Sequence, residues 1–136
     1  MNILKGKITE IQSSDTLSLI SVDVDGDTLS AVVLEGKKGI LNYKKGELVQ
    51  VIFKETEVGL AKNLSGLISF RNRFPAKIKK IEKGSVLAKI SLDYKNYRIE
   101  SIISAKSAEE MKLKESDAVE WLVKTNEVSL MTIHNV

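Results

Sequence analysis

An internal repeat constrains the fold of this chain more than any other feature, because a shift from Asn2 to Asn72 superimposes its two halves without a gap. Between the identities the apolar positions also agree, as at Val22 and Leu92. Further aligned identities are Lys7 and Ile8 with Lys77 and Ile78, Ile20 and Ser21 with Ile90 and Ser91, Lys54 with Lys124, and Glu57 and Val58 with Glu127 and Val128. Such a period predicts two copies of one small domain, which we place at residues 1–64 and 65–136.

Composition limits how these copies can be stabilised and where the protein works. A copy of about 65 residues is near the lower limit for an independent core, so we expect the copies to pack on each other or on other subunits. The 136 residues include no cysteine, which removes disulfides and thiolate metal sites. No apolar run approaches the roughly 18 residues of a membrane span, and no signal segment is evident, so we expect a cytoplasmic protein without membrane association.

Short apolar segments bounded by turn residues predict β-strands in both copies. We expect strands at 4–11, 17–24, 28–34, 48–54 and 57–61, and again at 76–81, 86–94, 97–103, 118–124 and 127–133. Asp25 and Gly26 predict a tight hairpin turn. Ser107 and Glu110 predict a capping box on a helical turn over 107–111. This order predicts an all-β protein of two tandem small OB-like Greek-key barrels, each with about five strands and one short helical turn.

Residues typical of catalysis are scarce. The single histidine, His134, lies two residues from the C-terminus, where we expect no functional role. The sequence has no nucleophile elbow and no phosphate-binding glycine loop, so we expect no enzymatic activity. The acidic run 23–27 resembles a calcium loop but lacks the distal glutamate, which favours a hairpin. Trp121 could stack on a nucleic-acid base, but it aligns with Val51, so core packing is favoured.

Groups that can hold an anion gather near the connector between the copies and near the helical turn. Hydroxyl and amide groups donate hydrogen bonds to oxygens, while arginine and lysine supply positive charge. The candidates are Ser69 and Arg71 in the connector, Ser104 and Ser107 beside the helical turn, and Lys124 and Thr125 at a strand end. Each of these residues alone is more often a cap or a solvated side chain, so the residues by themselves leave the ligand open.

The same residues carry a resemblance to a known family. The stretch from Asn63 to Asn72, followed by the stretch from Ile81 to Val86, is similar to the Mop domain of the molbindins. The molbindins are the molybdate- and tungstate-binding branch of domains that also end molybdate transporter ATPases and sensors. Further matching segments are 104–107, 111–114, 123–125 and 127–131. The resemblance covers the whole second copy, and it extends to the first copy through the internal repeat.

This resemblance implies a ligand and an assembly. In the family the oxyanion lies between Mop units, often from different subunits, so we expect molybdate or tungstate as ligand, no cofactor and no metal coordinated directly by side chains. By the same resemblance we expect a homo-oligomer, most often a trimer. Carried over residue by residue, Ser69 and Arg71 match the family's Ser-Ala-Arg-Asn element with Phe70 in place of alanine, Ser104 and Ser107 match its Thr-x-x-Ser element, and Lys124 and Thr125 match its Lys-Ala/Ser region.

The first copy departs from this pattern. It begins at Met1, so it has no serine and arginine of its own at the equivalent connector positions. Leu34 and Lys37 replace the two serines, Glu55 replaces the threonine, and only Lys54 remains of the expected set. We therefore expect fewer binding sites per chain than in a standard di-Mop protein, with the ligand held by the connector and the second copy.

Two alternative functions remain open from the sequence. One is a regulatory or partner-binding module, either the sensor half of a molybdate-responsive regulator or a degenerate molbindin. The other is an OB-type nucleic-acid binder. The net charge of +3 disfavours this second alternative, because proteins that follow a nucleic-acid backbone carry a stronger basic bias.

Overall fold

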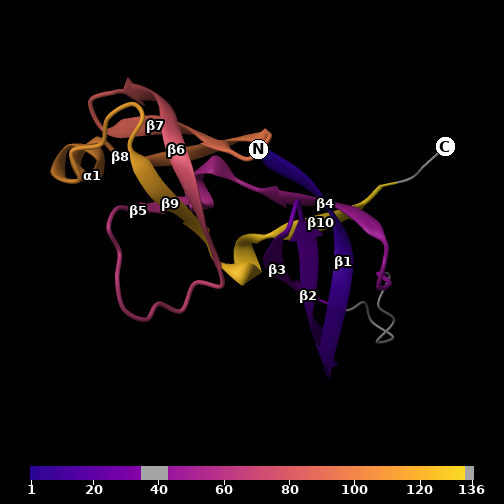
Figure 1. Ribbon diagram of the computed structural model, residues 1–136. Coiled ribbons are helices and arrows are strands. Elements are labelled where there is room, and N and C mark those ends of the chain that lie inside the picture. The colour runs from indigo at the N-terminus through magenta and orange to yellow at the C-terminus, as the bar shows by residue number, and fades with distance from the viewer. Residues whose placement is uncertain (35–42, 134–136) are drawn as a thin grey trace.

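The computed structural model describes residues 1–34 and 43–133, and its strands form two five-stranded antiparallel sheets, visible as two lobes in Figure 1. In the first sheet the order is β10 (Ser129–Thr132), β4 (Leu48–Phe53), β1 (Asn2–Ser14), β2 (Leu17–Val24) and β3 (Asp27–Leu34). In the second sheet the order is β5 (Gly59–Ala61), β9 (Ala118–Val123), β6 (Asn72–Lys83), β7 (Leu87–Tyr94) and β8 (Tyr97–Ser104). The all-β prediction is confirmed.

The two copies exchange their last strands. β5 ends the first copy but pairs with β9 of the second sheet, placing Leu60 opposite Trp121. β10 ends the second copy but pairs with β4 of the first sheet, placing Leu130 opposite Val51. Both crossings are visible in Figure 1, where β5 and β10 each run into the opposite lobe. Each sheet is therefore completed by the other half of the sequence, and the division at residues 64 and 65 stays a prediction about sequence repeats.

The local strand pairing follows the repeat closely. The β1–β2 register shifts between Ile8 and Glu10, and the β6–β7 register shifts at the equivalent place, between Ile78 and Lys80. The predicted hairpin turn between β2 and β3 is confirmed, since Asp25 and Gly26 have φ angles of 48° and 96°. Positive φ at both central residues is what a tight hairpin of this twist requires.

Two buried asparagines, Asn2 and Asn72, fasten the halves together at equivalent positions. The Asn72 side chain accepts from the Ser30 backbone N–H at 2.7 Å and donates to the Ser30 carbonyl at 2.8 Å. Asn2 makes the same pair of bonds with the Glu100 backbone, at 2.8 and 2.9 Å. Each amide thus acts like one extra residue of strand pairing between the first strand of one copy and the third strand of the other.

The hydrophobic core is continuous between the sheets and is centred on Trp121, which is fully buried. Its ring stacks on Phe53 of the other copy, with centroids 5.4 Å apart, and it contacts Phe74 and Tyr94. Core packing is therefore the role of Trp121, as its alignment with Val51 predicted. Such aromatic pairs stabilise a core beyond the area that they bury.

The ends of the β2–β3 and β7–β8 hairpins also meet. The Tyr94 hydroxyl donates to the Asp27 carboxylate at 2.6 Å, and Lys95 donates to the Asp25 carbonyl. The Tyr94 side chain is buried, and its ring contacts Phe74 and Trp121. Burial, together with the bond to Asp27, raises the pKa of Tyr94 above its ordinary range. Tyr94 therefore stays a neutral hydrogen-bond donor at physiological pH.

Several predicted boundaries were wrong. The helix α1 spans Ala105–Glu110, so it begins earlier than predicted, and its N-cap is Ser104, whose hydroxyl oxygen accepts from the Ser107 N–H. The predicted last strands were too long, because a 3₁₀ turn precedes each of them: η1 (Glu55–Glu57) before β5 and η2 (Thr125–Glu127) before β10. Pro75 lies inside β6, at a point where β6 pairs with β9 but not yet with β7.

Some sequence predictions fall outside the described residues. They concern Lys37, most of the segment between β3 and β4, and His134. No helix in residues 1–34 and 43–133 is long and apolar enough to cross a membrane.

Candidate functional site

A groove of about 450 Å³ brings three of the predicted site residues together, namely Ser104, Ser107 and Lys124. We call it the polar groove. Its walls come from both copies, because η1 and the residues after it pack against β8. Besides the three predicted residues it is lined by Thr56, Glu57, Val58, Gly59, Phe70, Ile102, Ile103 and Glu127.

The two serines of the polar groove are already arranged by the start of α1. The Ser104 hydroxyl donates to the Ser107 oxygen at 2.9 Å, and its own oxygen accepts the Ser107 N–H at 3.0 Å. The hydroxyl hydrogen of Ser107 is therefore not used in this pair and is available to another acceptor. A hydroxyl donor with Lys124 on the same groove is a chemical arrangement that suits an oxygen-rich anion.

The connector between β5 and β6 reaches the polar groove through Phe70. Ser69 and Arg71 lie on either side of Phe70, and both are exposed. Figure 1 shows the connector as an open loop that leaves the body of the second sheet and returns to it. Ser69 and Arg71 are thus sequence neighbours of the lining residue Phe70, but they do not line the groove themselves. Their role in binding stays a prediction.

Both ends of the connector are fastened to the second copy. Arg73 pairs with the two carboxylate oxygens of Glu120, at 2.6 and 2.9 Å, and also donates to the Leu64 carbonyl. The bond to Glu120 raises the pKa of the Arg73 guanidinium. Lys62 pairs with Asp117 at 2.9 Å, which lowers the pKa of that carboxyl group. These fixed ends limit where Ser69 and Arg71 can move.

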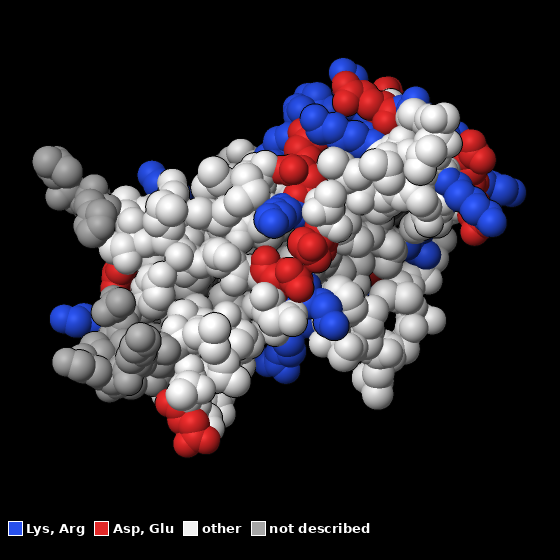
Figure 2. All heavy atoms as spheres, turned by 180° about the vertical axis from the view of Figure 1, so that it is seen from behind, with Lys and Arg blue, Asp and Glu red and all other residues white. Residues whose placement is uncertain are grey.

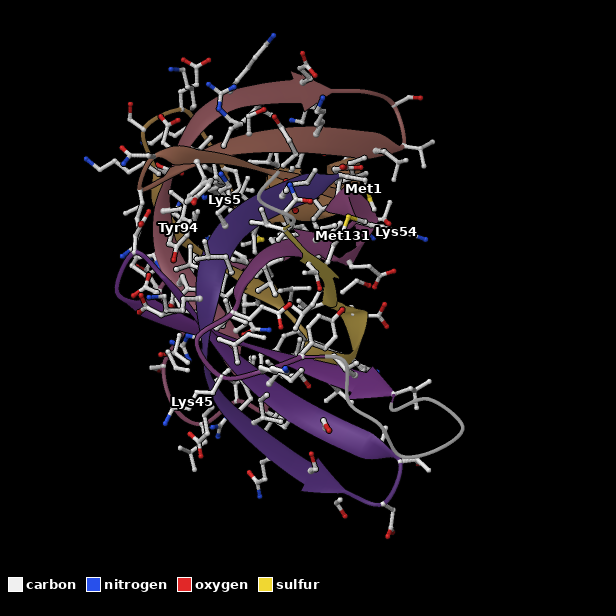
Figure 3. The ribbon with its side chains drawn as sticks, turned by 90° about the vertical axis from the view of Figure 1, so that its right-hand side faces the viewer. Met1, Lys5, Lys45, Lys54, Tyr94 and Met131 are labelled. Carbon is white, nitrogen blue, oxygen red and sulfur yellow. The ribbon has the colours of Figure 1, made fainter. Side chains whose placement is uncertain are left out.

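Lys54 and Thr125 do not line the polar groove. Lys54 lines a separate groove of about 240 Å³, which we call the small groove, together with Met1 and Asn126. Figure 3 shows Lys54 near Met1 and Met131, with its ammonium group directed outward. Thr125 is partly buried in η2, directly after Lys124. Glu55, which replaces the threonine in the first copy, pairs with the N-terminal ammonium group.

The repeat gives the polar groove a counterpart in the first copy, with a volume of about 470 Å³. We call this one the apolar groove. Val32, Val33 and Leu34 stand where Ile102, Ile103 and Ser104 line the polar groove. The other lining residues are Leu17, Tyr43, Asn126, Val128, Ser129 and Leu130. This groove has no lysine among its described lining residues, and the loss of a binding site from the first copy stays a prediction.

Sequence reasoning missed the contribution of the 3₁₀ turns to the polar groove. Glu57 of η1 and Glu127 of η2 both line it, and Thr56 lies beside Glu57. The identity of Glu57-Val58 with Glu127-Val128 in the repeat was a signal for these positions. We interpreted these positions as the starts of strands, because the residues that follow Glu57 and Glu127 are apolar. Among residues 1–34 and 43–133 no group of three or more His, Cys, Asp or Glu is placed to hold a metal ion.

Comparison with known proteins agrees with this geometry. A family model described as the TOBE domain matches residues 68–130, from the connector to β10. A crystal structure described as the cytoplasmic molybdate-binding protein ModG, with molybdate bound, is similar over 97% of this chain and 96% of that chain, with a TM-score of 0.91 and 26% sequence identity. No curated protein matches the chain. The matched domain, the tandem architecture and the near-complete overlap with ModG together support assignment of this chain to the molbindins, the tandem Mop/TOBE-domain proteins.

Proposed function

We propose that this protein is a cytoplasmic molybdate- or tungstate-binding protein that buffers or stores the oxyanion. The observation that carries the proposal is the convergence of Ser104, Ser107 and Lys124 on one groove between the two copies. The similar protein ModG, described as cytoplasmic and as binding molybdate, supports both the ligand class and the compartment.

The chemistry of the polar groove suits a tetrahedral dianion. Molybdate at neutral pH carries no proton, so every hydrogen bond to it must come from a donor on the protein. Ser107 and Lys124 are such donors, and Arg71 and Ser69 lie close by along the connector. A dianion loses a large hydration free energy on binding, which only several donors and cations together can offset. We therefore assign the ligand to the second copy and the connector, with Thr125 and Lys54 as more distant members of the set.

A calorimetric titration with molybdate, tungstate, sulfate and phosphate tests this function. We expect heat with the first two anions and little heat with the others. Heat with none of the four would reject the proposal. Binding of single-stranded nucleic acid with a strong salt dependence would instead favour the OB-type alternative.

The proposed assembly is a homo-oligomer, for which the family resemblance favours a trimer. An independent physical reason is that several large apolar side chains remain exposed in the single chain, including Leu67 of the connector and Leu34 of β3. A copy of about 65 residues also buries little apolar surface by itself, which favours further burial against another subunit. Sedimentation that shows only a 15.1 kDa species, with and without oxyanion, would reject an oligomer.

A further inference from the structure

Two glutamates share the polar groove with its one lysine. Glu57 lies in η1 and Glu127 lies in η2, at equivalent positions of the repeat, and both line the polar groove together with Lys124. Both glutamates also line the small groove that contains Lys54. They therefore form the wall that separates the two grooves, one carboxylate from each copy.

Among residues 1–34 and 43–133, no partner neutralises the charges of Glu57, Glu127 and Lys124. Within the described residues, the side chains of Glu57, Glu127 and Lys124 make no ion pair and no hydrogen bond. One cation and two anions thus give the side chains lining the groove a net charge of −1. An oxyanion that enters meets the donors of Ser107 and Lys124, and it also meets repulsion from two carboxylates at the same wall.

We propose that Glu57 and Glu127 set the affinity and the charge selectivity of the polar groove by opposing the charge of the bound anion. This inference rests on the function proposed above. The repulsion makes binding weaker than the donors alone would give, so the oxyanion can be released again. Because Coulomb energy is proportional to ligand charge, the two glutamates penalise a dianion twice as strongly as a monoanion of the same shape.

Ligand pairs of equal shape and different charge can test this. Tungstate and perrhenate are both tetrahedral oxyanions of similar size, with charges of −2 and −1. For Glu57→Gln, and separately for Glu127→Gln, we expect tungstate affinity to rise about fivefold and perrhenate affinity to rise about twofold, since both carboxylates are exposed and water screens them. Both gains should shrink when the ionic strength is raised from 0.05 M to 0.5 M.

Two control variants separate charge from structure. Glu57→Asp keeps the charge and should leave tungstate affinity within about twofold of the wild type. Glu10→Gln removes one negative charge from an exposed position of β1, outside the lining of the groove, and should change affinity very little. Thermal unfolding of all variants checks that each remains folded.

The outcomes are distinct. Unchanged or weaker tungstate binding by both glutamine variants, or equal gains for tungstate and perrhenate, would overturn the inference while the proposed function stands. If the wild type binds no oxyanion but the double variant Glu57→Gln/Glu127→Gln binds tungstate, the proposed function is rejected for the natural chain, while the opposing effect of the two carboxylates is supported. If neither protein binds any oxyanion, the proposed function fails and this inference fails with it.

Discussion

The polar and apolar grooves occupy equivalent places in the two copies but differ in chemistry. Ser104 caps α1 at the edge of one groove, whereas Leu34, at the same position of the repeat, is exposed at the edge of the other. The strands, their register and the buried asparagines are nearly the same in both halves. The comparison shows that the strands, their register and the buried asparagines are common to both copies, whereas Ser104 at the edge of one groove is replaced by Leu34 at the edge of the other.

The outer surface shows the same asymmetry. Figure 2 shows charged side chains gathered over the second sheet, while much of the surface over the first sheet is uncharged. Lys80, Lys89 and Arg98 of the second copy stand at the positions of Glu10, Leu19 and Thr28 in the first. At these three positions the second copy is therefore more basic than the first.

The largest expected effect is on the free energy of unfolding, and it tests the buried asparagines that both halves share. Asn72→Ala leaves the buried N–H and C=O groups of Ser30 without partners, and should lower the free energy of unfolding by about 3 kcal/mol. Asn2→Ala should cost about 2 kcal/mol, because Glu100 is only partly buried and water can replace some of the lost bonds. Denaturant unfolding measures both, with the exposed Asn126→Ala as control. Losses below 1 kcal/mol would show that the asparagines do not fasten the halves.

The next effect is on oxyanion affinity, and it tests the positively charged residues by which the two halves differ. Arg71→Ala and Lys124→Ala should each weaken oxyanion binding by about 2 kcal/mol or more, because each removes a charge-assisted hydrogen bond. Lys54→Ala should weaken binding less, since Lys54 lies in the small groove. Calorimetry compares the three variants directly. Binding that survives Arg71→Ala but is lost in Lys54→Ala would assign the ligand to the first copy instead.

A third test exchanges residues between the copies at one strand position. Gly6 of β1 aligns with Ala76 of β6, yet a Cβ on Gly6 would lie 2.4 Å from Val22 Cγ1 and 2.6 Å from the Asp23 carbonyl oxygen. Gly6→Ala should therefore destabilise the protein by about 2 kcal/mol, since the backbone of β2 must move. The reverse change, Ala76→Gly, should cost about 1 kcal/mol or less. If Gly6→Ala does not change the free energy of unfolding, β1 and β2 can move apart to admit the added Cβ. This strand pair would then be no tighter than β6 and β7.

The smallest expected effect concerns a bond that only one copy has. The Ser101 hydroxyl donates to the Val58 carbonyl at 2.7 Å, whereas the aligned residue in the first copy is Ala31. Ser101→Ala should lower the free energy of unfolding by about 1 kcal/mol, the typical net value of one buried hydrogen bond. Denaturant unfolding can resolve this difference, and a loss above 2 kcal/mol would show that Ser101 supports more than this contact.

Local patterns predicted most of the strands because each depends on neighbouring residues. β2 begins and ends at the predicted residues, since alternating apolar side chains fill it and Asp25-Gly26 permits only a tight turn after it. The start of α1 was harder to predict, because Ser104 and Ser107 both have the chemistry of an N-cap. Only the tertiary position of β8 decides between them.

The candidate site was predictable in part. Ser104, Ser107 and Lys124 could be proposed from sequence because hydroxyl and ammonium groups suit an oxyanion, and the fold does bring them to one groove. The repeat singles out Glu57 and Glu127 as equivalent positions, but the sequence does not show that Glu57 lies beside β8 of the other copy, because that depends on the exchange of strands. An apolar run of three or four residues specifies a strand but not the sheet that it joins.

Because the strands are exchanged, the connector is a covalent tether between two parts of the chain that bind each other. Each half of the chain holds a strand that the other half needs, so the halves are two binding partners joined by a short loop. Such a tether replaces the bulk concentration of a partner with an effective concentration on the order of millimolar. Assembly of the two sheets is therefore insensitive to dilution in the intact chain, whereas halves cut within residues 65–69 would have to find each other by diffusion.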